Sequence, residues 1–174
     1  MAIIWPKPLP AWIEVAMKYR GLREIPGKAH APKIQLMLKK LKAWWSDDET
    51  PWCGVFVGFC LKEVGLAIPK NWMRARDYEG WGIGKLIDPI PFGSVCTKTR
   101  VGGGHVFFAV AQTRDGQTVF GLGGNQSNMV NITAFKRKDI TAVRWPSDTS
   151  APVMQLPFAT SAELAAASIG GSEA

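Results

Sequence analysis

The chain has 174 residues, of which 47% are hydrophobic, so it can bury a core but leaves little room for a second large domain. Its formal net charge of +7 predicts a surface that attracts polyanions. The basic residues form neither a long run nor a stripe, which argues against nucleic acid as a partner. The three cysteines are an odd number and do not indicate a disulfide framework.

The N-terminus begins with a short apolar stretch that soon becomes rich in proline. Pro6, Pro8 and Pro10 interrupt it and Lys7 lies inside it, so it fits neither the apolar region of a signal peptide nor a membrane span. We therefore expect a protein that is made in a cytoplasm without a signal peptide and that does not insert stably into a membrane.

Three helices are predicted by apolar residues that recur at helical spacing, over about residues 10–21, 32–43 and 52–65. The third run is apolar nearly all round, which predicts a buried helix. A short helical segment is expected around residues 73–79.

After Pro91 the pattern changes to short runs rich in Val, Phe, Ile and Thr, separated by Gly, Asn and Asp. The runs are "GSVCTKT", "HVFFAVAQ", "TVFGL", "MVNITAF" and "TAVRW". The pair Asp115-Gly116 between the second and third runs predicts a hairpin turn. Helices followed by a meander of strands predict an α+β domain, with N-terminal helices packed on an antiparallel β-sheet.

The last part of the chain changes composition towards Ala, Ser, Pro and Gly. We therefore divide the sequence into a domain, residues 1–146, and a C-terminal tail, residues 147–174. The composition predicts a tail that is disordered or contacts a partner, with "SAELAAAS" able to form a turn or two of helix.

Cys53 lies at the start of the third predicted helix. A thiol attacks as the thiolate, which is a minor form of a free cysteine at neutral pH. The unpaired N–H groups and the dipole of a helix's first turn favour this anion, and the same amides can stabilise an oxyanion. Gly54 leaves room for a substrate to approach. Cys60 and Cys96 lack this setting and are expected in the core.

Two histidines are available as a general base. His105 opens the run "HVFFAV" beside a glycine-rich edge, so it is fixed on sheet backbone, whereas His30 lies in a Pro/Gly loop. Asn125 follows the next strand, where its amide can hold the imidazole of His105 in one orientation. The alternatives are that His105 is structural and that Asn125 serves only the turn.

Cysteine, histidine and asparagine occur here in the chain order of papain-like enzymes. The stretches "DETPWCGVFVGFCLKEVG", "RARDYEGWG", "GGGHVFFAV", "VFGLGGNQSNMVNI" and "VRWP" resemble the CHAP/NlpC-type cysteine peptidases of phages and bacteria, particularly those with a Trp-Cys motif and a Gly-Gly-Asn-Gln segment. The resemblance runs from about Glu14 to Pro146.

This resemblance implies a papain-like NlpC/CHAP fold and hydrolysis of an amide bond in the peptide part of peptidoglycan, as in a phage endolysin. It makes Cys53 the nucleophile, His105 the general base and Asn125 the orienting residue, with no cofactor. It also implies a monomer that acts on the bacterial cell wall after release or delivery, as an endopeptidase or an N-acetylmuramoyl-L-alanine amidase.

Four residues near these motifs are candidates for the substrate groove, although packing or turn formation explains each of them equally well: Trp52, Trp72, Trp81 and Gln126. The acidic residues Asp47, Asp48 and Glu49 lack the ligand spacing and the glycine turn of a calcium loop, so we expect no metal there.

Two other functions remain open at the level of sequence. A zinc amidase needs about three His, Cys or Asp ligands, yet no pair of them has the spacing of a helical or hairpin zinc motif. A basic chain with eight tryptophans also fits a module that binds the wall without cutting it.

Overall fold

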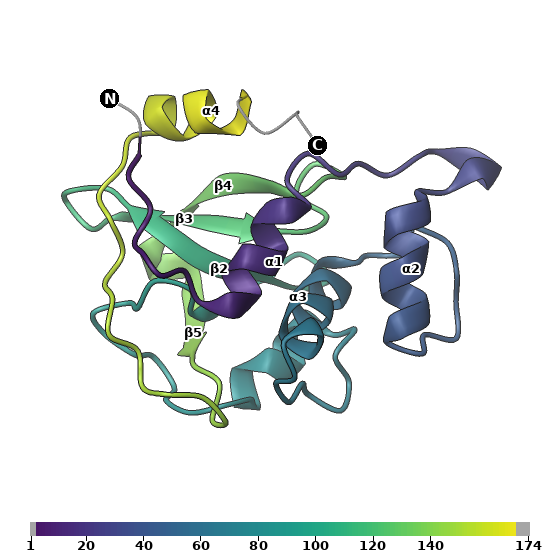
Figure 1. Ribbon diagram of the computed structural model, residues 1–174, viewed down its shortest axis with the longest axis horizontal. Coiled ribbons are helices and arrows are strands. Elements are labelled where there is room, and N and C mark those ends of the chain that lie inside the picture. Colours follow the sequence, from purple (N-terminus) through teal and green to yellow (C-terminus); the bar gives the residue numbers. More distant parts are fainter. Residues whose placement is uncertain (1–2, 170–174) are drawn as a thin grey trace.

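The computed structural model describes residues 3–169 of the chain, with side chains as far as residue 165. N-terminal helices pack on a five-stranded antiparallel sheet, which confirms the predicted α+β class. The order of elements also follows the prediction, with all the long N-terminal helices before the first strand (Figure 1).

The helices begin and end close to the predicted positions. Pro32 opens the second helix, where its fixed φ suits the first turn. The segment predicted around residues 73–79 forms a 3-10 helix. The bounds are Ala11–Lys18 (α1), Pro32–Lys40 (α2), Cys53–Glu63 (α3) and Ser161–Ile169 (α4), with short 3-10 helices at Gly27–Ala29 (η1), Ala75–Gly80 (η2) and Arg137–Asp139 (η3).

The strands lie in the spatial order β4-β3-β2-β1-β5. The predicted Asp-Gly turn joins β2 to β3, and its Gly116 has a φ of 68°, in the left-handed region that favours glycine. The central strand β2 thus carries His105 in a fixed register, opposite Lys98 of β1. The bounds are Val95–Arg100 (β1), Gly103–Gln112 (β2), Thr118–Gly123 (β3), Asn131–Lys136 (β4) and Ile140–Arg144 (β5).

The buried helix α3 packs against one face of this sheet. The ring of Phe56 on α3 meets that of Phe108 on β2 at a centroid distance of 6.4 Å. Successive strand residues point to opposite faces, so His105 and Phe107 lie on the face away from this contact. There Phe107 stacks on Phe135 of β4 with a centroid distance of 4.3 Å. The two faces therefore differ, with a helix-covered core on one side and a buried aromatic and polar cluster around Phe107 and His105 on the other.

The segment after β5 lies against the domain instead of standing away from it. At the end of β2, the backbone N–H of Gln112 donates to the carbonyl of Pro157 at 3.0 Å, and the backbone carbonyl of Gln112 accepts from the amide of Ala159 at 2.9 Å. Leu156 and Leu164 are buried. In Figure 1 this segment runs along the edge of the domain and leads into α4, which lies over the sheet next to β4. The tail was expected to be an appendage, but up to residue 165 it packs on the domain. The apolar residues scattered among its Ala, Ser and Pro residues account for this packing.

Within residues 3–169, no helix is both long and apolar enough to cross a bilayer.

Candidate active site

Cys53 is the first residue of α3 and is 3% exposed. The first intrahelical bond runs from the amide of Phe56 to the carbonyl of Trp52, at 2.9 Å, so the amides of Cys53 and Gly54 precede it and are free to act on the thiol. Cys53 thus lies on the first turn of a helix, at the predicted position.

The thiol of Cys53 lies beside the strand that carries the histidine. Burial raises the pKa of Cys53 above its ordinary value, while the backbone amide of Val106, the charge of Arg100 and the first amides of α3 lower it. The ladder between β2 and β3 begins at Phe108 and Leu122, which leaves the β2 backbone at Val106 without a β3 partner. The Cys53 thiol therefore lies at the backbone amide of Val106, the residue that follows His105.

The imidazole of His105 is 7% exposed and meets the side chain of Gln126. The distance from His105 Nε2 to Gln126 Oε1 is 2.9 Å. Burial lowers the pKa of His105 below its ordinary 6.5, the bond to Gln126 opposes this change, and the charges of Arg100 and Lys98 add to it. His105 is therefore neutral at neutral pH, as a general base must be.

The surroundings of Gln126 decide which nitrogen of His105 carries the proton. Gln126 Nε2 donates to the backbone carbonyls of Gly121 and Asn131, at 3.2 and 2.8 Å. These carbonyls can only accept, so the amide end that faces them is the NH₂ group and the oxygen faces His105. Because this oxygen can only accept, His105 Nε2 is protonated and Nδ1 keeps its lone pair. The ring is set to take a proton at Nδ1.

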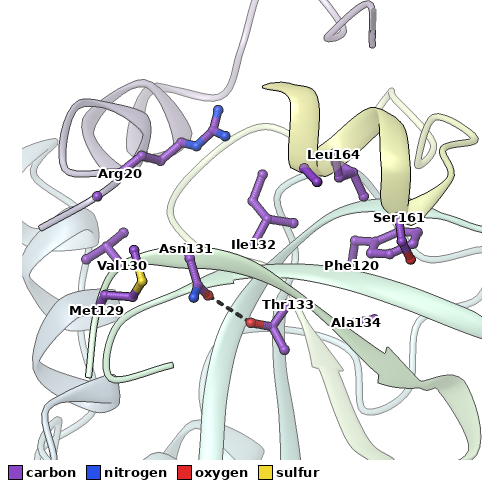
Figure 2. A pocket seen from close by; sticks show the side chains of 12 residues that line it. Arg20, Phe120, Met129, Val130, Asn131, Ile132, Thr133, Ala134, Ser161 and Leu164 are labelled. Carbon is purple, nitrogen blue, oxygen red and sulfur yellow. Dashed lines mark hydrogen bonds between the residues drawn. The ribbon is translucent and has the colours of Figure 1, made fainter. Parts of the chain in front are cut away.

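Two polar side chains of β4 support Gln126 from behind. Its NH₂ group also contacts Asn131 Oδ1 at 2.8 Å and Thr133 Oγ1 at 3.2 Å, and the Thr133 hydroxyl donates to Asn131 Oδ1 at 2.8 Å. Figure 2 shows this last bond on one side of β4, while Ile132 points to the other side, towards α4. The alternation of polar residues in "NIT" is the sequence signal for this pair, which was not among the predicted site residues.

The cleft drawn in Figure 2 shares Asn131 and Thr133 with this network. It has a volume of about 500 Å³ and lies between the end of α1, β4 and α4. Its lining is mostly apolar, with Phe120, Ile132 and Leu164, and the Arg20 guanidinium points towards it (Figure 2). His105 is not among the described residues that line this cleft, although Thr133 lines both it and the cavity at His105.

The Gly-Gly-Asn-Gln segment has a steric reason for each glycine. A Cβ on Gly123 would lie 2.6 Å from Gln126 Oε1, and a Cβ on Gly124 would lie 2.6 Å from atoms of Trp52 and Phe56. Asn125 has a φ of 56°, which asparagine tolerates better than most residues. Asn125 lines the same cavity as His105, but the side chain that meets the imidazole is that of Gln126. This geometry fits the alternative in which Asn125 serves the turn.

The three tryptophans considered for a substrate groove are all buried. Trp52 is 0% exposed and donates from Nε1 to Glu24 Oε1 at 2.6 Å. Trp72 stacks on Trp45 at a centroid distance of 5.8 Å, and Trp81 donates from Nε1 to the carbonyl of Ala67 at 3.1 Å. These contacts favour the packing interpretation, because each ring is engaged by the protein itself.

The space beside Gly54 is also filled by the protein. A Cβ at this position would lie 2.5 Å from the carbonyl oxygen of Trp72 and 2.9 Å from that of Met73. The Tyr78 hydroxyl donates to the carbonyl of Gly54 at 2.8 Å and holds η2 next to α3. Gly54 thus allows close packing of the segment before η2, and the space that was predicted to admit substrate is filled by that segment.

Cys60 and Cys96 are fully buried, and all three cysteines are free. Burial raises the pKa of both thiols above the ordinary range. Both are core residues, as predicted.

A cavity of about 210 Å³ opens at His105. Two basic residues of β1, Lys98 and Arg100, line it; the sequence analysis did not single them out, although "TKTR" alternates in the pattern of a strand. The remaining lining residues are Asn125, Gln126, Ser127, Thr133 and Phe135.

His30 belongs to a different region. Its Nδ1 lies 2.9 Å from Oδ1 of the fully buried Asp48, whose Oδ2 accepts from the amides of Ile25 and Ala31 at 2.9 and 2.7 Å. Burial raises the pKa of Asp48, but these three hydrogen bonds prevail and hold it below the ordinary value. Among the described residues, no three His, Cys, Asp or Glu side chains are grouped so as to hold a metal ion.

The chain was compared with protein families, with curated proteins and with solved structures, and none of them matches it.

Proposed function

We propose that this chain is a cysteine hydrolase of papain-like NlpC/CHAP fold that cleaves an amide bond in the peptide part of bacterial peptidoglycan. One observation carries the proposal. Gln126 holds His105 so that Nδ1 can accept a proton, and the next residue along the strand, Val106, directs its backbone amide at the Cys53 thiol. Cys53 is the nucleophile and His105 the general base. The orienting role, expected of Asn125 from the resemblance, passes in this proposal to Gln126.

The first half of the reaction forms a thioester. Because burial keeps Cys53 as a thiol and His105 as a neutral imidazole, the thiol proton moves to His105 Nδ1 as Sγ attacks the carbonyl carbon. The amides at the start of α3 stabilise the oxyanion that forms. The C–N bond then breaks, and the imidazolium gives its proton to the departing amine.

The second half returns the enzyme to its starting state. His105 takes a proton from water at Nδ1 while the water oxygen attacks the thioester carbonyl. The C–S bond breaks, the peptide leaves with a new carboxyl group, and the imidazolium of His105 gives its proton to Sγ, which restores the thiol of Cys53. Gln126 stays bonded to Nε2–H throughout, so the ring keeps its orientation in both halves.

The choice of peptidoglycan as substrate rests on the resemblance of the motifs and on the positive charge of the chain. A net charge of +7 suits an anionic cell wall. In this proposal the protein acts as a monomeric phage endolysin that reaches the wall after release or delivery, either as an endopeptidase or as an N-acetylmuramoyl-L-alanine amidase.

The direct test replaces Cys53 and follows the soluble fragments that are released from purified peptidoglycan, by mass spectrometry. Cys53→Ala should release none, while its circular dichroism and melting temperature stay close to those of the parent. Cys60→Ala is the matched control and should keep activity, because Cys60 lies in the core. Full activity of Cys53→Ala would contradict the proposal, and wall binding without fragments in the parent protein would favour the non-catalytic module.

A further inference from the structure

The basic residues beside His105 have no acidic partners in the described part of the chain. Lys98 lies directly opposite His105 in the β1–β2 ladder, and Arg100 lies two residues further on, opposite Gly103. Alternation along β1 puts both side chains on the face of His105. None of the salt bridges among the described residues includes either of them.

The cavity at His105 is therefore positively charged. Its described lining has two cations, Lys98 and Arg100, and no carboxylate. Lys98 Nζ is held over the ring of Phe135 at 5.3 Å from its centroid, which gives the ammonium group a defined place at the cavity wall. The charge of Arg100 acts on both Cys53 and His105. An anion in this cavity would thus lie beside His105, the general base of the proposed reaction.

We propose that Lys98 and Arg100 form a subsite for a carboxylate of the wall peptide, next to the amide that Cys53 attacks. The inference rests on the proposed function and deepens it, because it names the charge that the substrate carries near the cleaved bond. A guanidinium and an ammonium group on one wall suit a carboxylate, which accepts charge-assisted hydrogen bonds from both. A carboxamide in the same place offers one neutral oxygen and an NH₂ group that faces the cations.

The test compares a wall tetrapeptide with the same peptide after its carboxylates are converted to carboxamides. Binding is measured by calorimetry on the Cys53→Ala protein, which cannot turn the peptides over. We expect the carboxylate form to bind about tenfold more tightly, the size of effect that hydrogen bonds to charged groups produce. The preference should weaken at high salt, because the charges are partly exposed.

Variants in the same background assign the preference to these two residues. Lys98→Gln/Arg100→Gln should bind both peptides with similar affinity, and Lys98→Arg/Arg100→Lys should keep most of the preference. Lys28→Gln/Lys39→Gln is the matched control: it removes two exposed positive charges that lie outside the cavity, and it should behave as the parent. Circular dichroism checks that each variant is folded.

The outcomes separate this inference from the proposed function. Equal binding of the two peptides, a preference that survives in Lys98→Gln/Arg100→Gln, or no measurable binding of either peptide would overturn the subsite. If the protein with Cys53 intact cuts both peptides at the same rate, the hydrolase stands and the subsite falls. If it cuts neither, but Cys53→Ala shows the preference and its dependence on the two residues, the subsite stands and the hydrolase falls.

Discussion

Both histidines lie 2.9 Å from a side-chain oxygen, but the two regions use the contact differently. His30 meets the carboxylate of Asp48, which also accepts two backbone amides and so joins the loop around η1 to the segment before α3. His105 meets the amide of Gln126, whose remaining contacts fix its direction. The first contact fastens two loops together, whereas the second sets the tautomer of a ring.

The chemical difference between the two acceptors has a consequence for charge. A carboxylate stabilises an imidazolium, while an amide oxygen fixes the ring and adds no net charge. With an amide as partner, burial and the nearby cations keep the pKa of His105 below its ordinary value. Gln126 thus holds an imidazole that stays neutral, whereas Asp48 connects two loops.

Replacing each imidazole should give the largest contrast between the two regions. His105→Gln removes the base and should lower kcat/KM on the wall peptide about 10³-fold, the usual size of general base catalysis. His30→Gln should leave kcat/KM nearly unchanged and lower the free energy of unfolding by about 1 kcal/mol, because Asp48 keeps its two amides. Steady-state kinetics and urea unfolding measure both. An equal loss of activity in the two variants would break the comparison.

Removing each acceptor should give a smaller contrast of the same kind. Gln126→Met frees the ring and should lower kcat about 10²-fold with little change in KM, since misplaced groups lose rate rather than affinity. Asp48→Asn should lower the free energy of unfolding by about 2 kcal/mol, because two amides lose a charged acceptor, and should leave kcat unchanged. A fall of stability in Gln126→Met with kcat preserved would reduce Gln126 to a packing role.

Most of the fold could be predicted from the sequence, because its signals are local. Each signal depends only on residues that are close in the chain. These signals are the helical spacing of apolar residues in α1 to α3, the Asp115-Gly116 turn and the strand runs after Pro91. The tail was harder, since its contacts with the end of β2 depend on backbone bonds such as that from Gln112 to Pro157. Composition reports how much apolar surface a segment has, but not which strand end it meets.

The site could be predicted only in its outline. Cys53 at a helix start and His105 on a strand follow from local pattern, and the structure places the Cys53 thiol at the amide of Val106, next to His105 in the chain. Which of two neighbouring amides faces the imidazole depends on φ in a turn of left-handed residues, so Asn125 and Gln126 could not be distinguished. Lys98 and Arg100 come to His105 through the β1–β2 register, which the sequence does not specify.

The protonation of His105 is the finest test of the comparison. The chain has two histidines, so two imidazole signals can be followed by NMR and assigned with His30→Gln. His105 should titrate below 6.5, because burial lowers its pKa, and the acid limb of kcat/KM should lie at the same pH. Since the depressed pKa belongs to the folded state, its contribution to stability is complete above about pH 6.5 and is lost as the pH falls through the folded pKa.

Lys98→Gln should raise the pKa of His105 and Gln126→Met should lower it, because the Lys98 charge opposes the imidazolium while the Gln126 oxygen supports it. Titration of His105 at or above 6.5 would mean that burial and the nearby cations do not lower its pKa, and that the two regions differ only in their hydrogen bonds.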